Sequence, residues 1–330
     1  MEVTLARKRG ICVKKKRGLK LLIGIISILV IIDIAASFYF YNLAIERNTK
    51  DFLQGNADLE VSAEAMEVFT EGDWRAWEDK QDFKRWELTS FDGLKLNAYF
   101  LPAKEPTNKT VILAHGYLGS GLDMGLYGKY YYEKLGYNIL MPDARGQGES
   151  EGDYIGFGWH DRLDYVKWID LVKEKLGDDS EIVLHGVSMG AATVLMTSGE
   201  DLPDNVKAIV SDSAYTSVED LFAYQMKRMY HLPKVPFLTS TSLVTELRAG
   251  YNFEEASALK QVKKTDIPIL YYHGNADTFV PTRMAHELYK NTASPAEIMT
   301  IDNAGHGEGF VVEKEAYVKK LRSFLGKYVN

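Results

Sequence analysis

The most continuous hydrophobic stretch of the chain lies close to its N-terminus. From Leu19 to Ile45 it reads LKLLIGIISILVIIDIAASFYFYNLAI, with Asp33 as its one acidic residue. A helix needs about 20 apolar residues to cross the hydrocarbon core of a bilayer. One acid inside the span costs about 2.5–3.5 kcal/mol, which the many Leu, Ile, Val and Phe residues offset. The pattern predicts a transmembrane helix over residues 19–45, and the run from Phe38 to Tyr41 is typical of an interfacial aromatic belt.

The charge before this run sets the expected orientation. Residues 1–20 hold eight Lys and Arg against Glu2, whereas the whole chain has a net charge of −7. Basic residues beside a span stay on the cytoplasmic side. Residues 1–18 are therefore expected to be a basic cytoplasmic N-terminus, with the rest of the protein outside the cytoplasm. The alternative is a cleaved signal peptide that ends near Ala36, followed by secretion. An uncleaved anchor is favoured because the apolar run continues past Ala36.

The hydrophobic pattern changes along the remaining chain. Residues 46–82 are rich in acids and predict a stalk or an irregular helical lead-in. From residue 83 to 330, short apolar runs alternate with helical periodicity. The first two runs, FKRWELTS and KLNAYFLPA, predict an antiparallel pair. Strand-like runs follow in the order TVILAHG, NILMPDARG, EIVLHGVS, VKAIVSDS, IPILYYHGNAD and EIMTIDNAG.

This alternation predicts an α/β fold. Runs such as Val111 to Ala114 are apolar at every position, as in parallel strands that are buried on both faces. The expected architecture is a mostly parallel, twisted sheet with helices on both faces. In such sheets, ligands bind beyond the carboxyl ends of the strands. The chemistry should therefore follow the apolar runs.

Composition narrows the possible functions. Because residues 1–20 are so basic, the rest of the chain is strongly acidic, which disfavours nucleic-acid binding. The single cysteine, Cys12, excludes an internal disulfide and a cysteine-rich zinc site. We expect no cofactor, because no spacing of histidines and carboxylates indicates a metal site.

A serine follows the strand EIVLHGVS in a distinctive turn. The residues from Gly186 to Gly190 read G-V-S-M-G, and a helix of small residues is expected after Met189. In the G-x-S-x-G turn, small neighbours allow a strained serine to project over the edge of the sheet. Ser188 is therefore the candidate nucleophile. The N–H of Met189 and the N–H of Tyr117, in the turn HGY after an earlier strand, are the candidate oxyanion donors.

A serine hydroxyl is a weak nucleophile unless a base activates it. His306 closes one of the later strands, and its imidazole is the candidate general base and acid. Asp277 closes another strand and is the candidate acid that orients the histidine. Asp212, also at a strand end, is the rival for that role.

Several motifs together resemble the α/β-hydrolase superfamily from about residue 83 onward. They are HGYLGS, DARGQGES, HGVSMG, HGNADTFVP and GHGE. The resemblance is to the branch of bacterial esterases, lipases and serine-aminopeptidase-like enzymes. It implies hydrolysis of carboxylic esters, or less often of amides or thioesters, without a cofactor, and EC class 3.1.1 is the class we expect. The turn NADTFVP resembles the acid loop of that family, which favours Asp277 over Asp212.

A long insertion precedes the strand IPILYYHGNAD. Residues 215–265 contain two stretches of helical character, which predicts a small helical cap over Ser188. Its apolar residues either line a substrate pocket or pack the cap on the core, and the sequence does not separate these. The candidate pocket residues are Leu118, Tyr215, Tyr224 and Met226. They favour a small-molecule or lipid-like ester as substrate.

Two other functions remain open from the sequence. A peptidase or amidase could use the same scaffold, with Lys227, Arg228 and Arg248 as candidates for binding a peptide end. A binding protein that retained the fold without catalysis is the other. The complete set of Ser188, Asp277 and His306 disfavours it.

Overall fold

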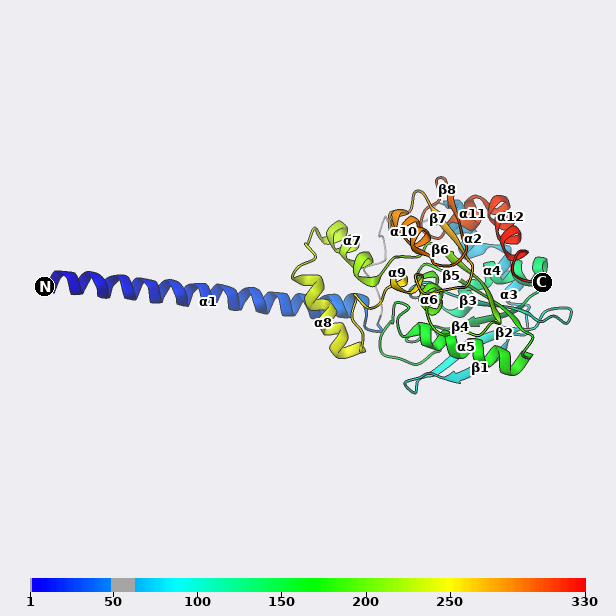
Figure 1. The fold of residues 1–330 in the computed structure, drawn as a ribbon, viewed down its shortest axis with the longest axis horizontal. Helices are drawn as coiled ribbons and strands as arrows, with labels where there is room; N and C mark the ends of the chain where they lie inside the picture. The colour runs from blue at the N-terminus through cyan, green and yellow to red at the C-terminus, as the bar shows by residue number, and fades with distance from the viewer. Residues whose placement is uncertain (1, 49–62) are drawn as a thin grey trace.

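The structure is a computed structural model that describes residues 2–48 and 63–330, with side chains for residues 18–48 and 65–330. A long N-terminal helix, α1 (Glu2–Ala44), projects from a rounded body that holds the rest of the described chain (Figure 1). Gly18–Ala44 within it is apolar and long enough to cross a membrane. By length and composition alone, such a helix is either a membrane anchor or a signal sequence.

The body is built on one eight-stranded sheet, whose strand order is β1-β2-β4-β3-β5-β6-β7-β8. The first two strands form the predicted antiparallel pair, β2 is also antiparallel to β4, and the other neighbours are parallel. The α/β prediction is therefore confirmed. The strands are β1 (Lys84–Thr89), β2 (Lys95–Leu101), β3 (Lys109–Ala114), β4 (Asn138–Pro142), β5 (Glu181–Val187), β6 (Val206–Asp212), β7 (Ile269–Gly274) and β8 (Ala296–Ile301).

Alternate side chains of the central strands enter two separate hydrophobic clusters. On β3, Ile112 packs with helix α5 (Asp161–Leu176) and helix α6 (Met189–Thr197). Val111 belongs to the other cluster, with α4 (Gly125–Tyr130) and α12 (Lys314–Leu325). Because successive residues of a strand point to opposite faces, this division places helices on both sides of the sheet. The remaining short helical segments are η2 (Gly121–Met124), η3 (Tyr131–Leu135), α10 (Arg283–Asn291) and α11 (Gly309–Val312).

The predicted lead-in lies partly outside the described residues, because 49–62 are not among them. The described part forms α2 (Ala63–Glu71) and α3 (Asp73–Glu78). Trp74 and Trp77 of α3 are buried against the body, where they join the cluster of α4. This part is therefore packed on the fold instead of standing free as a stalk.

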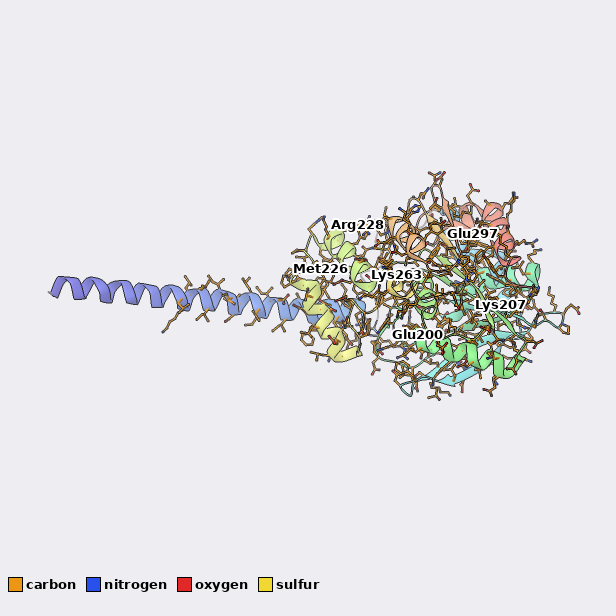
Figure 2. All side chains as sticks on the ribbon, in the orientation of Figure 1. Glu200, Lys207, Met226, Arg228, Lys263 and Glu297 are labelled. Carbon is orange, nitrogen blue, oxygen red and sulfur yellow. The ribbon has the colours of Figure 1, made fainter. Side chains whose placement is uncertain are left out.

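The insertion before β7 folds into helices at the end of the body from which α1 emerges. They are α7 (Val218–Tyr230), α8 (Phe237–Ala249) and the short α9 (Ala258–Gln261). In Figure 1, α8 crosses the last part of α1, and α7 lies beside α8. Figure 2 shows Met226 and Arg228 at this end of the body, whereas Lys207 and Glu297 lie farther from α1. We refer to α7, α8 and the turn between them as the cap.

Candidate active site

Ser188 occupies a strained turn between β5 and α6. Its backbone has φ 55° and ψ −116°, a conformation that L-residues rarely adopt. Two glycines make the turn possible. A Cβ atom at Gly190 would lie 2.0 Å from the carbonyl oxygen of Ala114, and one at Gly186 would lie 2.2 Å from the carbonyl oxygen of Gly190. The sequence G-V-S-M-G therefore lets α6 approach β3 closely enough to hold the serine at the sheet edge.

The three residues predicted from separate strand ends meet at this edge. The hydroxyl oxygen of Ser188 lies 2.7 Å from Nε2 of His306. On the other side of the imidazole, Nδ1 lies 2.7 Å from Oδ2 of Asp277. Both distances are those of good hydrogen bonds. The arrangement can pass a proton from the serine to the imidazole while a carboxylate faces the far nitrogen.

The loop after β7 prepares Asp277 to stay ionised. Its Oδ1 accepts hydrogen bonds from the backbone N–H groups of Phe279 and Val280, at 2.9 and 2.8 Å. Burial alone would raise the pKa of Asp277, but the charge of His306 and the hydrogen bonds from His306 and His273 outweigh it and lower the pKa. Burial would likewise lower the pKa of His306, but the neighbouring charge of Asp277 raises that pKa above its ordinary value.

The rival acid, Asp212, is held by other partners. Its carboxylate accepts hydrogen bonds from the hydroxyls of Tyr317, at 3.0 Å, and Ser213, also at 3.0 Å. Burial raises its pKa. Its backbone carbonyl accepts the N–H of Ser188 at 2.8 Å. Asp212 therefore supports the turn of Ser188, while Asp277 is the carboxylate hydrogen-bonded to His306.

The loop after β3 passes directly beside Ser188. A Cβ atom at Gly116 would lie 3.6 Å from Cβ of Ser188. Among the hydrogen bonds of the described residues, the backbone N–H groups of Tyr117 and Met189 have no protein acceptor. The N–H of the next residue, Leu118, is already bound to the side chain of Gln147 at 2.6 Å. The N–H groups of Tyr117 and Met189 are therefore available to a ligand, and their role as oxyanion donors stays a prediction.

Three other histidines near these strands make structural contacts, and the first of them, His273, lies 2.7 Å from the carbonyl oxygen of Val280. His115 accepts the backbone N–H of Ala144 at 2.9 Å, which joins the loops after β3 and β4. His185 lies between two tyrosine hydroxyls, and burial lowers its pKa to about 3. In the part of the chain with described side chains, no group of three His, Cys, Asp or Glu residues could hold a metal ion.

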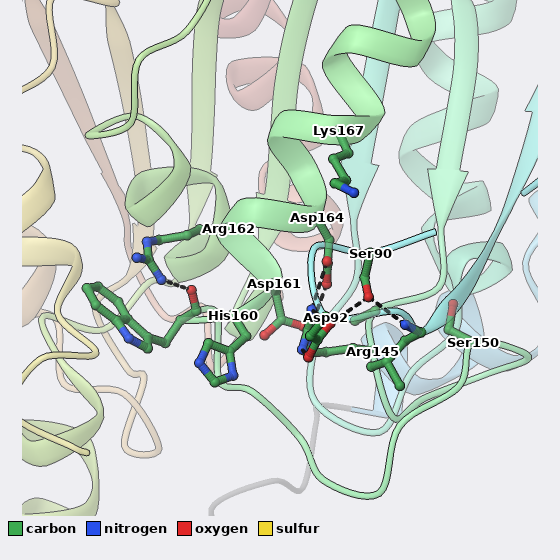
Figure 3. A network of polar contacts seen from close by, with 12 residues as sticks. Ser90, Asp92, Arg145, Ser150, His160, Asp161, Arg162, Asp164 and Lys167 are labelled. Atoms are coloured by element: carbon green, nitrogen blue, oxygen red, sulfur yellow. Dashed lines mark hydrogen bonds and ion pairs between the residues drawn. The ribbon is translucent and has the colours of Figure 1, made fainter. Parts of the chain in front are cut away.

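The motif DARGQGES forms a buried ion network that supports the loop after β4 (Figure 3). The guanidinium of Arg145 donates two hydrogen bonds to Asp164, both 2.8 Å long, and two more to Asp92. Asp143 accepts the backbone N–H groups of Gly121 and Glu149. The contacts of Arg145 and Asp143 are therefore those of residues that brace this loop.

An apolar cavity lies between Ser188 and the cap. Its volume is about 110 Å³, several times the roughly 10–15 Å³ that one water needs on this measure. Apart from Ser188, the polar groups on its wall are only those of Gln225, Thr241 and a few tyrosines. The cavity therefore suits a hydrophobic part of a ligand next to the serine hydroxyl.

Two of the four predicted pocket residues line this cavity. Tyr215 and Met226 are on its wall, together with Tyr117 and Met189. Leu118 is not, because it sits in a positive-φ turn and its side chain is 41% exposed. Tyr224 is not either, because its hydroxyl donates to the carbonyl of Thr278 and ties the cap to the loop of Asp277.

The sequence reasoning missed part of the wall that comes from α1. Phe40, Leu43 and Ala44 line the cavity, and the hydroxyl of Tyr117 donates to the carbonyl of Ala44 at 2.7 Å. The aromatic run from Phe38 to Tyr41 was the available signal, but it also fits a membrane interface. Other wall residues that the sequence reasoning did not name include Phe157, Phe222, Tyr230, Leu238, Phe279 and Val280.

Comparisons with known proteins agree with this fold. The sequence model described as "alpha/beta hydrolase fold" matches residues 109–234, which include β3 to β6, Ser188 and the first cap helix. The structure is similar to that of an esterase from Pyrococcus furiosus, with a TM-score of 0.62 and 24% sequence identity over 79% of this chain and 94% of that one.

Two sequence relatives extend the comparison. The chain is 28% identical over 250 residues to the uncharacterized protein YqkD of Bacillus subtilis, covering 74% of this chain and 81% of that protein. It is 25% identical over 191 residues to the lysophosphatidylserine lipase ABHD12 of Danio rerio, covering 56% of this chain and 47% of that protein. The protein has the α/β-hydrolase fold, and these similarities support a hydrolase.

Proposed function

We propose that this protein is a serine hydrolase that cleaves carboxylic esters. The observation that carries the proposal is the hydrogen-bonded series from Ser188 through His306 to Asp277, placed at the wall of an apolar cavity. A structural serine has no need of a buried imidazole and carboxylate in line with its hydroxyl. Such a series is what a weak nucleophile requires for activation.

Each residue then has one role in the reaction. Nε2 of His306 takes the proton of Ser188 as the hydroxyl oxygen attacks the ester carbonyl carbon. The N–H groups of Tyr117 and Met189 stabilise the resulting oxyanion. His306 returns the proton to the leaving alcohol, which leaves an acyl group on Ser188. In the second half of the reaction, His306 takes a proton from a water molecule as the water attacks the acyl group. It then returns the proton to Ser188 and the carboxylic acid is released. Asp277 holds the imidazole in the correct tautomer throughout.

The cavity favours an ester with an apolar acyl group over a peptide. A site for a peptide end would need a charged group at the pocket. The three candidates for that role do not line the cavity, and Arg228 instead donates to the carbonyl of Thr278 at 2.6 Å. The similarity to an esterase and to a lysophosphatidylserine lipase supports the same preference.

We also propose that α1 remains attached as a single membrane anchor, with its basic N-terminus in the cytoplasm and the body outside. Cleavage near Ala36 would remove Asp33, whose carboxylate accepts a hydrogen bond from Ser240 of α8. The folded body therefore includes a contact with the part of α1 that cleavage would remove. This contact favours retention over secretion.

The test is hydrolysis by the full-length chain in detergent. Initial rates are measured on p-nitrophenyl esters from acetate to palmitate, for the parent protein and for Ser188→Ala. We expect turnover that the substitution abolishes. Ser211→Ala is the matched control, since Ser211 is a buried serine at the end of β6 whose hydroxyl has no partner among the described residues. Absence of turnover in the folded parent protein contradicts the esterase proposal.

A further inference from the structure

The cap helix α8 packs along the last turns of α1. The hydroxyl of Ser240, near the start of α8, donates to Oδ2 of Asp33 at 2.5 Å. Near the other end of α8, the guanidinium of Arg248 lies 5.4 Å from the ring centre of Tyr41. Contacts at both ends show that α8 rises beside α1 in the same direction, from the level of Asp33 to that of Tyr41. Asp33, the one acid of the apolar run, thus has its partner in the cap.

This packing leaves the part of α1 outside the cap too short to cross a bilayer by itself. The part below the cap, from Leu19 to Ile32, spans about 20 Å at about 1.5 Å per residue. The hydrocarbon core of a bilayer is about 30 Å thick and takes about 20 helical residues. If the span begins at Leu19, its far boundary falls near Phe38. The part of α8 that lies beside Asp33 is then within the membrane thickness.

The surface of the cap at this level is apolar. On α8, Leu243 and Leu247 are one helical turn apart and are 57% and 79% exposed. Val235, in the turn before α8, is 67% exposed. On α1, Phe38 and Tyr39 are about half exposed, and the guanidinium of Arg248 of α8 lies over the ring of Phe38. We call these five residues the cap face, which continues the lipid-facing surface of α1 onto the body.

Charged residues flank the cap face at both ends of α8. Arg248 sits at the end of α8 nearest the body and packs over the rings of Phe38 and Tyr41. Lys234, in the turn between α7 and α8, is exposed and pairs with Glu219 of α7 at 3.0 Å. Long basic side chains can keep their stems in apolar surroundings and their charges among lipid headgroups. Glu246 is also exposed on α8, and a charged side chain at this place suits an interfacial helix better than one deep in the hydrocarbon core.

We propose that the cap face is seated in the bilayer leaflet next to the body, with α8 as an interfacial helix, and that the cavity takes an acyl chain from that leaflet. The cavity wall is built from the same elements, with Phe40 on α1, Tyr230 on α7 and Leu238 on α8. An acyl chain moving from the membrane to Ser188 would therefore stay among apolar side chains. The proposal rests on α1 spanning a membrane. Its second part, on the acyl chain, also rests on the proposed hydrolysis.

The depth of the cap is measured with the full-length chain in vesicles of phosphatidylcholine and phosphatidylglycerol. Cys12, the single cysteine, is replaced by Ser. One new cysteine at Leu243 or Leu247 is labelled with a nitrobenzoxadiazole fluorophore. The control is Glu105→Cys, an exposed position before β3, at the sheet edge opposite Ser188. We expect lipids that carry a spin label on the acyl chain to quench the two cap positions several-fold more than the control.

Two outcomes overturn the membrane contact. One is quenching at Leu243 and Leu247 no stronger than at Glu105. The other is efficient cross-linking between copies through these cysteines without quenching, which would make the cap face an interface between two chains. Neither measurement depends on hydrolysis, so a failure here is distinct from a failure of the esterase proposal.

The route of the acyl chain is tested with Leu243→Gln combined with Leu247→Gln, since neither residue lines the cavity. We expect the double variant to hydrolyse a water-soluble acetate ester at the parent rate. A long-chain ester embedded in the vesicles should be hydrolysed several-fold more slowly. Equal loss on both substrates, or no loss on either, overturns the membrane route. Absence of hydrolysis of both esters by the parent protein contradicts the proposed function and also removes the premise of the acyl-chain route.

Discussion

The hydroxyl of Tyr117 donates a hydrogen bond of 2.7 Å to the carbonyl oxygen of Ala44. Ala44 is the last residue of α1, and the final carbonyls of a helix lack partners within the helix. Tyr117 belongs to the loop that lies beside Ser188. The end of the N-terminal helix and the candidate oxyanion loop are therefore joined by one side chain.

Tyr117→Phe should remove this bond and keep the ring. The carbonyl of Ala44 would be left in a largely buried place without its donor, at a cost of about 1–3 kcal/mol in the free energy of unfolding. The backbone N–H of Tyr117 is unchanged, so most of the activity should remain. Denaturant unfolding of both proteins in one detergent measures the loss. Equal stability would show that the bond contributes nothing.

A chain that begins at residue 46 should be clearly less stable than the full chain. It lacks Tyr41 and Ile45, which are 5% and 0% exposed in the core of the body. Burying side chains of this size contributes about 1.5–3 kcal/mol each, so we expect a loss of about 3 kcal/mol or more. Thermal melting in the same detergent makes the comparison. Removal of residues 2–17 alone is the control and should leave the melting temperature nearly unchanged.

Asp277→Asn should change both the rate and its pH dependence. His306 must be neutral to act as a base, and its pKa is raised above 6.5, so kcat/KM of the parent should fall as the pH drops through that raised pKa. Burial alone lowers this pKa. Without the charge of Asp277, the acid limb should therefore move to lower pH, while the plateau falls by about 10³–10⁴.

Asp212→Asn is the matched comparison for this experiment. Asp212 makes a smaller contribution to the raised pKa of His306 than Asp277 does, and its carboxylate accepts hydrogen bonds from Tyr317 and Ser213. We expect a small shift of the acid limb and a plateau close to that of the parent. A larger loss for Asp212→Asn than for Asp277→Asn would reverse the assignment of the acid.

Leu43→Trp should alter the preference for acyl chain length. Leu43 lines the cavity from α1, so a larger side chain there takes space from a long acyl group and leaves room for acetate. We expect the ratio of kcat/KM for palmitate to that for acetate to fall about tenfold, equivalent to about 1.4 kcal/mol. Tyr39→Trp is the control, since Tyr39 is on α1 but is 55% exposed and does not line the cavity. An unchanged ratio would show that α1 does not line the site that binds the acyl group.

Glu78→Gln should stabilise the protein at high pH only. Burial raises the pKa of Glu78 from 4.5 to about 7. A carboxyl with a folded pKa above its unfolded value destabilises the fold progressively from pH 4.5 to 7, and fully above that. The free energy of unfolding, measured with denaturant, should be the same for the variant and the parent at pH 4. At pH 8 it should be higher for the variant by about 1 kcal/mol, after allowance for the partial exposure of Glu78. A difference in the free energy of unfolding that stays constant from pH 4 to pH 8 would contradict the raised pKa of Glu78.

Local pattern was sufficient for the strands and for the residues that follow them. Continuous apolar runs predicted the buried parallel strands, and Gly186 and Gly190 predicted the strained turn of Ser188. Each of these signals lies within a few residues of the feature it predicts. The residues of the cavity wall were harder to predict from the sequence. Leu118 and Tyr224 turn away from the cavity because they make hydrogen bonds with segments that are distant in the chain. Those contacts have no local signal.

The sequence alone determined the α/β order of elements, the apolar N-terminal run and the candidates Ser188, Asp277 and His306, because these depend on periodicity and on residue types at strand ends. Only the tertiary structure decided that Asp277 and not Asp212 faces His306, and that α1 packs against the cap and lines the cavity. An uninterrupted apolar helix has no polar face to show which side meets lipid and which meets protein. That distinction arises only when another part of the chain, here Ser240 and its helix, packs against it.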